Sequence, residues 1–340
     1  MTLGALNMQY SNLPLQVMMA TYQSGDLQSY IQSIHNEVIQ QLAWGEYYYF
    51  TGNAKKSIPY VEPYLKHEDK MIRLYAWLVY TFSNVSLGKL SLSEIGISEI
   101  QNAIELEGIN ESKENRLIWL LLVSSCRILF HLPMEKANFF QQSLKGLPDG
   151  VKLYCCYLMA HKLYTEKEYN RSLGIVQTIL SCSENTYPIL FILLNLVAAI
   201  DSINLKDIEN AKAYFLEAWS YAKADHILVV IGQYHGLLKG LVELCVKEQD
   251  AEDYEEIIRI ANQFGRGWMH VHDSQASTEA VDLLTSIEFM IASLAAEDWS
   301  NQEIADYLQI SVRTVKYHIA SIFNKFHIGS RKQIKEHLPN

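Results

Sequence analysis

The sequence predicts an all-α protein, and three observations lead to this fold class. Seven Pro and sixteen Gly in 340 residues are too few turn residues for a sandwich or barrel of many short strands. From about Leu15 to Phe264, apolar residues recur at helical spacing with no useful run of strand-like alternation. Apolar residues make up 49% of the chain and charged residues 19%, which excludes a mainly disordered protein. A chain of this length is expected to form more than one domain.

The clearest candidate for a repeated unit is a helix pair near the N-terminus. Small residues at Gly45 and Ser57 would let two antiparallel helices approach closely, and larger residues would fill the groove between them: Trp44, Tyr48, Val61 and Tyr64. This pattern resembles the tetratricopeptide repeat, and further copies are expected in residues 160–179, 199–218 and 254–261. The small residue of the unit recurs after 39 residues, from Ser172 to Ala211, whereas the tetratricopeptide repeat is about 34 residues long. The repeats are therefore degenerate. We expect an α-solenoid of such repeats, which presents a concave binding surface.

A domain boundary is expected near residue 275. Gly265-Arg266-Gly267 interrupts the helical pattern, and residues 270–278 are small and polar, as in a linker. We therefore expect a helical-repeat domain in residues 1–268, a linker in residues 269–281 and a second domain in residues 282–340. His270 and His272 have no partner at a metal-ligand spacing, so we expect no metal site.

Cysteine usage and hydropathy indicate a cytoplasmic protein. Five cysteines without a Cys-x-x-Cys pair are typical of a reducing compartment. Residues 1–30 lack the basic flank and apolar stretch of a signal peptide. The most apolar segments, residues 117–132 and 188–200, are shorter than the roughly 18 to 20 residues of a membrane span, so we expect buried helices and no membrane partner.

Residues 284–338 hold the most specific pattern in the chain. Capping boxes, in which a Ser or Thr precedes a Glu or Gln by three residues, mark helix starts at Thr285, Ser300 and Ser330. Ser311 is a suitable N-cap for a further helix over residues 312–326. Only Gln309-Ile310 joins the second helix to the third, so the four short helices predict a helix-turn-helix.

The third of these helices divides into faces when its residues are placed at roughly 100° intervals. An apolar stripe is expected to pack inward: Val312, Val315, Ile319, Ile322, Phe323 and Phe326. The adjacent stripe suits the base edges of a DNA major groove, with Lys316 and Tyr317 the best candidates in a set of five: Arg313, Lys316, Tyr317, Ala320 and Asn324. N-cap and groove-wall residues are expected to contact phosphates: Ser300, Asn301, Ser311, Thr314, His318, Ser321, Lys325, Arg331 and Lys332.

The net charge of −10 is unevenly distributed. Residues 281–340 hold six Lys and Arg against seven Asp and Glu, whereas residues 1–280 hold 22 against 31. Residues 311–335 contain Lys and Arg but no Asp or Glu. This gives a nearly neutral domain one positive face suited to phosphates. The acidic excess of the helical part favours a cationic or polar effector there over a polyanion.

The C-terminal motifs closely resemble the LuxR/GerE-type helix-turn-helix family. The resemblance covers about 55 residues and rests on three stretches: Leu284-Thr285-x-x-Glu288, Ser300-Asn301-x-Glu303-Ile304-Ala305-x-x-Leu308-x-Ile310-Ser311-x-x-Thr314-Val315-Lys316, and Lys325-Phe326-x-Ile328-x-Ser330-Arg331. It implies that the third helix enters the major groove with Lys316, Tyr317 and Ala320 toward the bases. It also implies that the fourth helix forms a dimer contact, for which the candidates are Ile334, His337 and Leu338.

Two positions depart from this family pattern. Ile287 stands where the family usually has Arg, which removes an ion-pair partner for Glu288. Asp298 stands where a Gly is typical. We therefore expect these departures to affect stability rather than DNA contact.

The sequence as a whole predicts a cytoplasmic, sequence-specific transcription regulator. The expected partners are double-stranded DNA, a second copy of the chain in a homodimer, and a peptide, protein or small-molecule effector on the repeat domain. Family precedent favours an activator, which would also contact RNA polymerase. No catalytic residues, cofactor site or Gly-rich phosphate loop are expected, so an enzyme is not predicted. The alternative is a helical-repeat interaction scaffold whose C-terminal bundle does not bind DNA.

Overall fold

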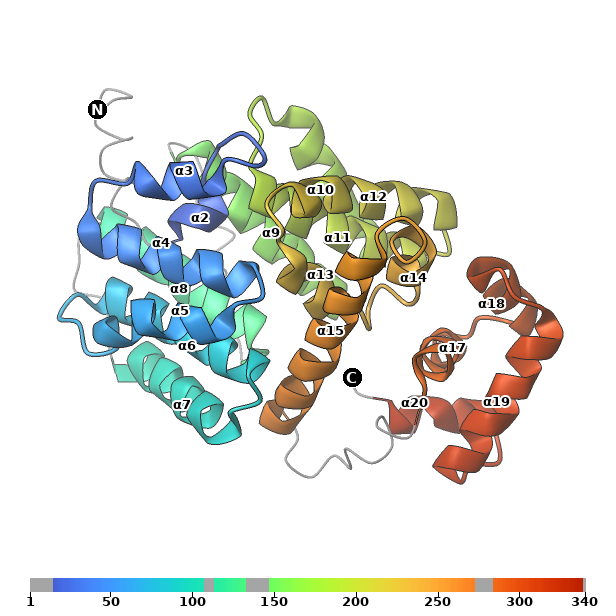
Figure 1. Ribbon diagram of the computed structural model, residues 1–340. Coiled ribbons are helices and arrows are strands. Elements are labelled where there is room, and N and C mark those ends of the chain that lie inside the picture. The colour runs from blue at the N-terminus through green and yellow to red at the C-terminus, as the bar shows by residue number, and fades with distance from the viewer. Residues whose placement is uncertain (1–14, 107–112, 133–146, 273–283, 339–340) are drawn as a thin grey trace.

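The computed structural model describes residues 15–106, 113–132, 147–272 and 284–338, and the regular secondary structure of these residues is helical. Figure 1 shows three groups of elements: α2 to α8, α9 to α14, and a C-terminal unit beyond α15. The first group comprises α2 (Gln16–Met19), α3 (Leu27–Gln32), α4 (Glu37–Phe50), α5 (Ala54–Val61), a 3₁₀ turn (Glu62–Tyr64), α6 (Lys70–Ser86), α7 (Leu90–Leu106) and α8 (Lys113–Leu129). The second comprises α9 (Asp149–Thr165), α10 (Tyr169–Cys182), α11 (Pro188–Asn204), α12 (Ile208–Ala224), α13 (Leu228–Tyr234) and α14 (Leu241–Cys245), followed by α15 (Ala251–His272). The C-terminal unit comprises α17 (Ser286–Ala296), α18 (Asn301–Leu308), α19 (Val312–Phe326), a 3₁₀ turn (Arg331–Gln333) and α20 (Ile334–His337).

Neighbouring helices pack in pairs at the small residues that the sequence singled out. In the α4–α5 pair, a Cβ added to Gly45 would lie 2.5 Å from Val61 Cγ1, so only glycine permits this approach. In the α9–α10 pair, the buried Ser172 hydroxyl donates to the Ala160 carbonyl at 2.9 Å. These small residues lie at helix contacts, as the degenerate repeat pattern requires.

The short helix α2 packs against the core of the helical part. Helix α2 contacts α4, α9 and α11, and Val17 is fully buried. The Val17 amide donates to Glu46 Oε2 at 3.3 Å. Burial raises the pKa of the Glu46 carboxyl to about 7, against hydrogen bonds that lower it. The core of the helical part therefore contains an acidic group that titrates near neutrality.

The predicted helix break at residues 265–267 is wrong. Helix α15 continues without interruption from Ala251 to His272. A glycine within a helix costs only about 1 kcal/mol, and the packing of α15 against α6, α7 and α13 outweighs that penalty. Residues 269–272 of the expected linker are thus helical, and its residues 273–281 lie outside the described part of the chain.

Both strongly apolar segments form helices, as predicted. Helix α11 is buried along most of its length, and the described side chains of α8 include the buried Leu121, Leu122 and Cys126. Within the described residues, none of the helices combines the length and apolar character that crossing a membrane requires.

Candidate nucleic-acid interface

Helices α17, α18 and α19 begin at the predicted caps, whereas the cap at Ser330 starts the 3₁₀ turn that precedes α20. Thr285 with Glu288, Ser300 with Glu303, and Ser330 with Gln333 each form a capping box. Ser311 accepts a hydrogen bond from the Thr314 amide at 3.0 Å and starts α19 at Val312, as the sequence predicted. These caps satisfy amides that a helix start otherwise leaves unpaired, so the local sequence fixes each helix boundary.

Helix α19 is held by its apolar stripe and presents the opposite face to solvent. Val315, Ile322 and Phe326 are buried against the rest of the unit. The five predicted base-reading residues are all exposed: Arg313, Lys316, Tyr317, Ala320 and Asn324. Tyr317 is a large side chain with 72% of its surface accessible. A rigid helix with exposed cations, an aromatic ring and an amide is the arrangement that major-groove readout uses.

Glu288 joins α17 to the C-terminal half of α19. Its carboxylate accepts from Ser321 Oγ at 2.6 Å, from Lys325 Nζ at 2.7 Å, and from the Thr285 amide and hydroxyl, both at 2.8 Å. Burial raises the pKa of this carboxyl, but hydrogen bonds from Lys325, Ser321 and Thr285 outweigh that effect and lower the pKa to about 2. Lys325 thus provides the cation that Ile287, in place of the family's usual Arg, cannot provide.

This network changes the interpretation of two predicted phosphate contacts. Ser321 and Lys325 point to Glu288 and lie half-buried in the unit. Ser321 would have to leave the carboxylate to donate to a phosphate, because its one hydroxyl hydrogen is already donated to Glu288. The sequence suggested a groove-wall role because helical geometry places them on one stripe, but it carries no signal for a partner more than thirty residues away.

The remaining phosphate candidates fall into three groups. Ser300, Ser311 and Thr314 take part in N-caps at the surface. Arg331 donates to Asn301 Oδ1 at 2.7 Å and to the Trp299 carbonyl, which ties the start of the fourth helix to the start of α18. Lys332 is exposed, whereas His318 is half-buried and its Nδ1 has no hydrogen-bond partner among the described residues.

The three dimer candidates pack into the unit itself. Ile334 is fully buried within the unit, beneath the surface of the fourth helix. The His337 ring stacks on Phe326 with centroids 5.2 Å apart, and Leu338 is half-buried. Lys335 and Glu336 are the exposed residues of this short helix.

Asp298 occupies the tight connection between α17 and α18. Its φ of +58° lies in the left-handed region, which glycine adopts most readily and Asp tolerates. The backbone here therefore explains why glycine is typical at this position in the family that the sequence resembles.

The C-terminal unit lies against the helical part through α17, α18 and the connection between them. The Tyr307 hydroxyl donates to the Leu238 carbonyl at 3.3 Å, in the segment between α13 and α14. Lys206 Nζ lies 2.8 Å from Glu303 Oε1 and 5.6 Å from the centre of the Trp299 ring. These contacts leave the outward face of α19 accessible, and no local sequence pattern indicated them.

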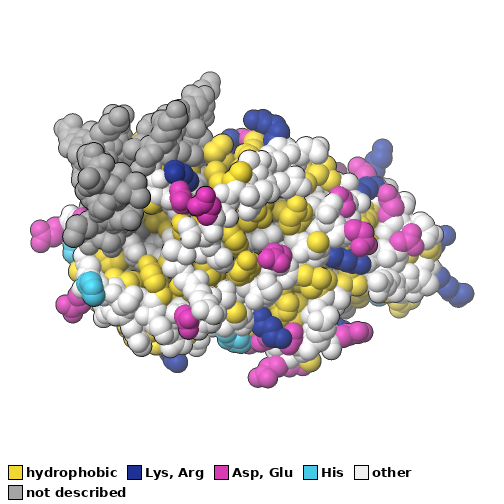
Figure 2. Space-filling model, turned by 90° about the horizontal axis from the view of Figure 1, so that it is seen from above, with side chains coloured by type: hydrophobic (Ala, Val, Ile, Leu, Met, Phe, Trp, Pro, Cys, Tyr) yellow, Lys and Arg dark blue, Asp and Glu magenta, His cyan; other side chains and the backbone are white. Residues whose placement is uncertain are grey.

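Acidic and basic side chains are mixed over the visible surface. Figure 2 shows one face of the molecule, where both signs are interspersed with apolar side chains and no field of one sign extends across it. The run of basic residues from Ser311 to Lys335, without an Asp or Glu, belongs to α19 and the segment after it.

Together, α18, the connection through Gln309 and α19 form a helix-turn-helix domain. Residues 282–337 match the family model described as bacterial regulatory proteins, luxR family. The C-terminal unit is therefore a LuxR-family helix-turn-helix domain.

The chain also matches curated regulatory proteins over part of its length. The chain is 41% identical over 58 residues to the transcriptional regulatory protein ComA of Bacillus subtilis, covering 17% of this chain and 27% of ComA. It is 30% identical over 134 residues to the response regulator protein VraR of Staphylococcus saprophyticus, covering 38% of this chain and 60% of VraR. For VraR of Staphylococcus aureus the identity is 40% over 55 residues, or 16% of this chain and 26% of VraR.

The chain thus spans between about a quarter and 60% of the length of these relatives. No solved structure matches the chain.

Proposed function

We propose that this protein is a sequence-specific DNA-binding transcriptional regulator. The exposed face of α19, on a LuxR-family domain, is the observation that carries the proposal. ComA, which matches the C-terminal region, is itself named as a transcriptional regulatory protein. No catalytic step forms part of this function.

The proposed roles divide along α19. Lys316 and Tyr317 read base edges at the centre of the face, with Arg313, Ala320 and Asn324 beside them. Ala320 has only a methyl group, so it contributes apolar contact, such as with a thymine methyl. Their exposure supports this assignment, because none has to leave the protein core to reach DNA.

Phosphate contacts are proposed around this face. Lys332 is an exposed cation, and Thr314 and His318 flank the reading face. Ser300, Asn301, Ser311 and Arg331 lie at the helix starts, where backbone amides favour anions. Ser321 and Lys325 support α19 through Glu288 and contact phosphates only if that network opens.

The rest of the chain is proposed to control this domain. Residues 1–272, to the end of α15, form the sensor, 273–281 the connection and 282–340 the DNA-binding domain. We propose a cytoplasmic homodimer that acts as an activator through RNA polymerase and responds to a peptide, protein or small-molecule effector. Of the predicted dimer contacts on the fourth helix, His337 and Leu338 reach the surface, whereas Ile334 lies beneath it.

Selection from random duplexes followed by fluorescence anisotropy tests this function. The full chain should enrich a defined sequence and bind it at least about a thousand-fold more tightly than a scrambled duplex, the lower end for specific regulators. Affinity should fall steeply with salt, because bound cations release the counterions of DNA phosphates. Failure to enrich any sequence, with no binding above background at low salt, would instead favour the interaction scaffold.

A further inference from the structure

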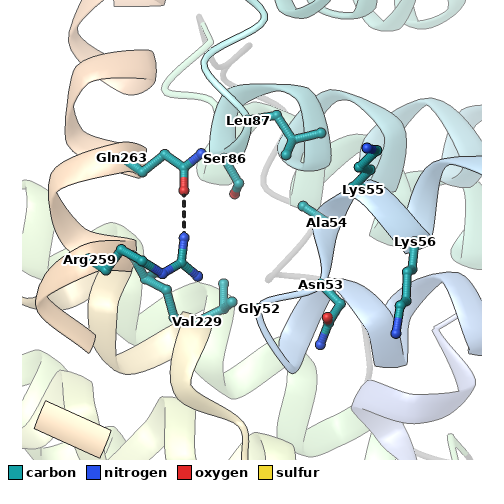
Figure 3. A pocket seen from close by; sticks show the side chains of 11 residues that line it. Gly52, Asn53, Ala54, Lys55, Lys56, Ser86, Leu87, Val229, Arg259 and Gln263 are labelled. Carbon is teal, nitrogen blue, oxygen red and sulfur yellow. Dashed lines mark hydrogen bonds between the residues drawn. The ribbon is translucent and has the colours of Figure 1, made fainter. Parts of the chain in front are cut away.

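The helical part contains a cavity of about 280 Å³ between its first helix pair and α15. One wall comes from the α4–α5 turn and the start of α5, and another from the end of α6 and the start of α13. Arg259 and Gln263 of α15 form the wall opposite α5, as Figure 3 shows. A space of this size lies at the lower end for small-molecule sites.

The polar groups around this cavity are mainly hydrogen-bond donors. Arg259 is held in place because its Nε donates to Glu256 Oε2 at 2.7 Å and its Nη1 donates to Gln263 Oε1 at 3.0 Å. The second bond occupies the Gln263 oxygen, so its amide nitrogen, which Figure 3 shows on the side of Ser86, is left to donate. Ser86 also lines the cavity, and its hydroxyl is buried.

The charges around the cavity are mainly positive. The cavity is lined by Lys55, Lys56 and Arg259. The carboxylate beside them is that of Glu256, which accepts a hydrogen bond from Arg259. In Figure 3 the two lysine side chains lean outward at the rim, from which their flexible stems can turn toward a bound anion. This local excess of cations is the reverse of the overall charge of residues 1–280, which hold 22 basic and 31 acidic residues.

The cavity also lies where the helical part can transmit a signal. Gly52 in the α4–α5 turn has φ +78°, and a Cβ added there would lie 3.5 Å from both Glu256 Oε1 and Ile260 Cδ1 of α15. The turn and α15 thus meet beside the cavity, and α15 is the last described helix before the DNA-binding domain. A ligand that bridges the turn and Arg259 would stabilise one position of α15.

We propose that this cavity binds a small metabolite with a multiply charged oxyanion group, anchored by Arg259 and completed by Lys55 and Lys56. This ligand is the effector of the regulator, so the inference rests on the proposed function and names the chemical class of its signal. The cations and hydrogen-bond donors that line the cavity favour an anionic ligand, whereas the net charge of residues 1–280 favoured a cationic or polar effector.

Isothermal titration calorimetry on the full chain tests the site with two probes, pyrophosphate and citrate, at constant ionic strength. We expect saturable one-to-one binding of one probe, and the preferred probe identifies a phosphate or a carboxylate ligand. Arg259→Gln should weaken binding at least tenfold, and the Lys55→Gln/Lys56→Gln variant several-fold while keeping the Arg259–Glu256 pair. Lys66→Gln removes an exposed lysine that does not line the cavity and should leave binding unchanged. Absence of binding for both probes, or equal binding by wild type and folded Arg259→Gln, overturns the site.

A second measurement separates this inference from the proposed function. With the preferred probe present, the affinity of wild type for its selected duplex should change at least threefold, while that of Arg259→Gln should not. If the wild type binds DNA but neither probe, only the effector site is wrong. If it binds a probe but selects no DNA, the proposed function fails and the anion site stands as a ligand site without its regulatory role.

Discussion

Replacing Glu288 with Gln tests the carboxylate that joins α17 to α19. The variant loses the charge that accepts from Lys325, Ser321 and Thr285, and it leaves the Lys325 ammonium half-buried without its counterion. Folding lowers the pKa of Glu288 from 4.5 to about 2, and this shift corresponds to at most about 3 kcal/mol of stabilisation of the folded domain. Because the amide retains part of the hydrogen bonding, we expect a loss of about 2 kcal/mol in the stability of this domain.

The sign of the pH dependence follows from the lowered pKa. A carboxyl whose folded pKa lies below its unfolded value stabilises the fold fully above the unfolded value and loses this contribution as the pH falls toward the folded value. The difference between wild type and Glu288→Gln should therefore be largest near pH 7 and shrink below about pH 4.5, continuing toward pH 2.

Hydrogen exchange followed by mass spectrometry measures this loss within the domain. A destabilisation of about 2 kcal/mol should speed exchange in peptides from α17 and α19 roughly thirtyfold at neutral pH. Peptides from α11 should not change. Glu336→Gln removes an exposed carboxylate from the same domain and serves as the control. Equal exchange in the two variants would refute the role assigned to Glu288.

Three further predictions concern other contacts. Gly45→Val should lower the stability of the helical part by about 1–3 kcal/mol in urea unfolding, because its Cβ would meet Val61. Gly174→Val should cost much less, because a Cβ there has no neighbour within 4 Å. Equal losses of stability in the two variants would contradict the close approach of α4 and α5. Asp298→Gly should slow exchange at the end of α17 by relieving the left-handed φ, a gain of about 0.5–1 kcal/mol, and faster exchange would argue against strain there. A hydrogen bond from Lys206 and those of the Ser300 cap lower the pKa of Glu303 to about 2, so Lys206→Gln should raise this pKa in an NMR titration; an unchanged value would contradict the contact between the two domains.

Local sequence signals predicted the C-terminal domain well. The capping residues and the 3.6-residue apolar period act over one or two turns, so they define α17, α18 and α19 without knowledge of the tertiary structure. The exposed face of α19 followed from the same period. Small residues such as Gly45 likewise indicated where helices pair, because close approach excludes larger side chains.

Features that depend on distant residues could not be predicted in this way. Helix α15 continues through Gly265 because tertiary packing outweighs local propensity. Lys325 pairs with Glu288 across 37 residues, and nothing local to either residue signals that contact. The cavity beside Arg259 draws its lining from four helices and the turn between α4 and α5, so no local pattern in the sequence indicates it.

The role of α19 in reading DNA is tested most directly by two matched lysine variants. Lys316→Ala and Lys335→Ala each remove one exposed cation from the same domain, but only Lys316 lies on the proposed reading face. In anisotropy measurements on the selected duplex, Lys316→Ala should lose about 1–3 kcal/mol of binding free energy and discriminate less well at one base position. Lys335→Ala should retain the wild-type sequence preference. Equal affinity and equal sequence preference in both variants would contradict the assignment of α19 as the helix that reads DNA.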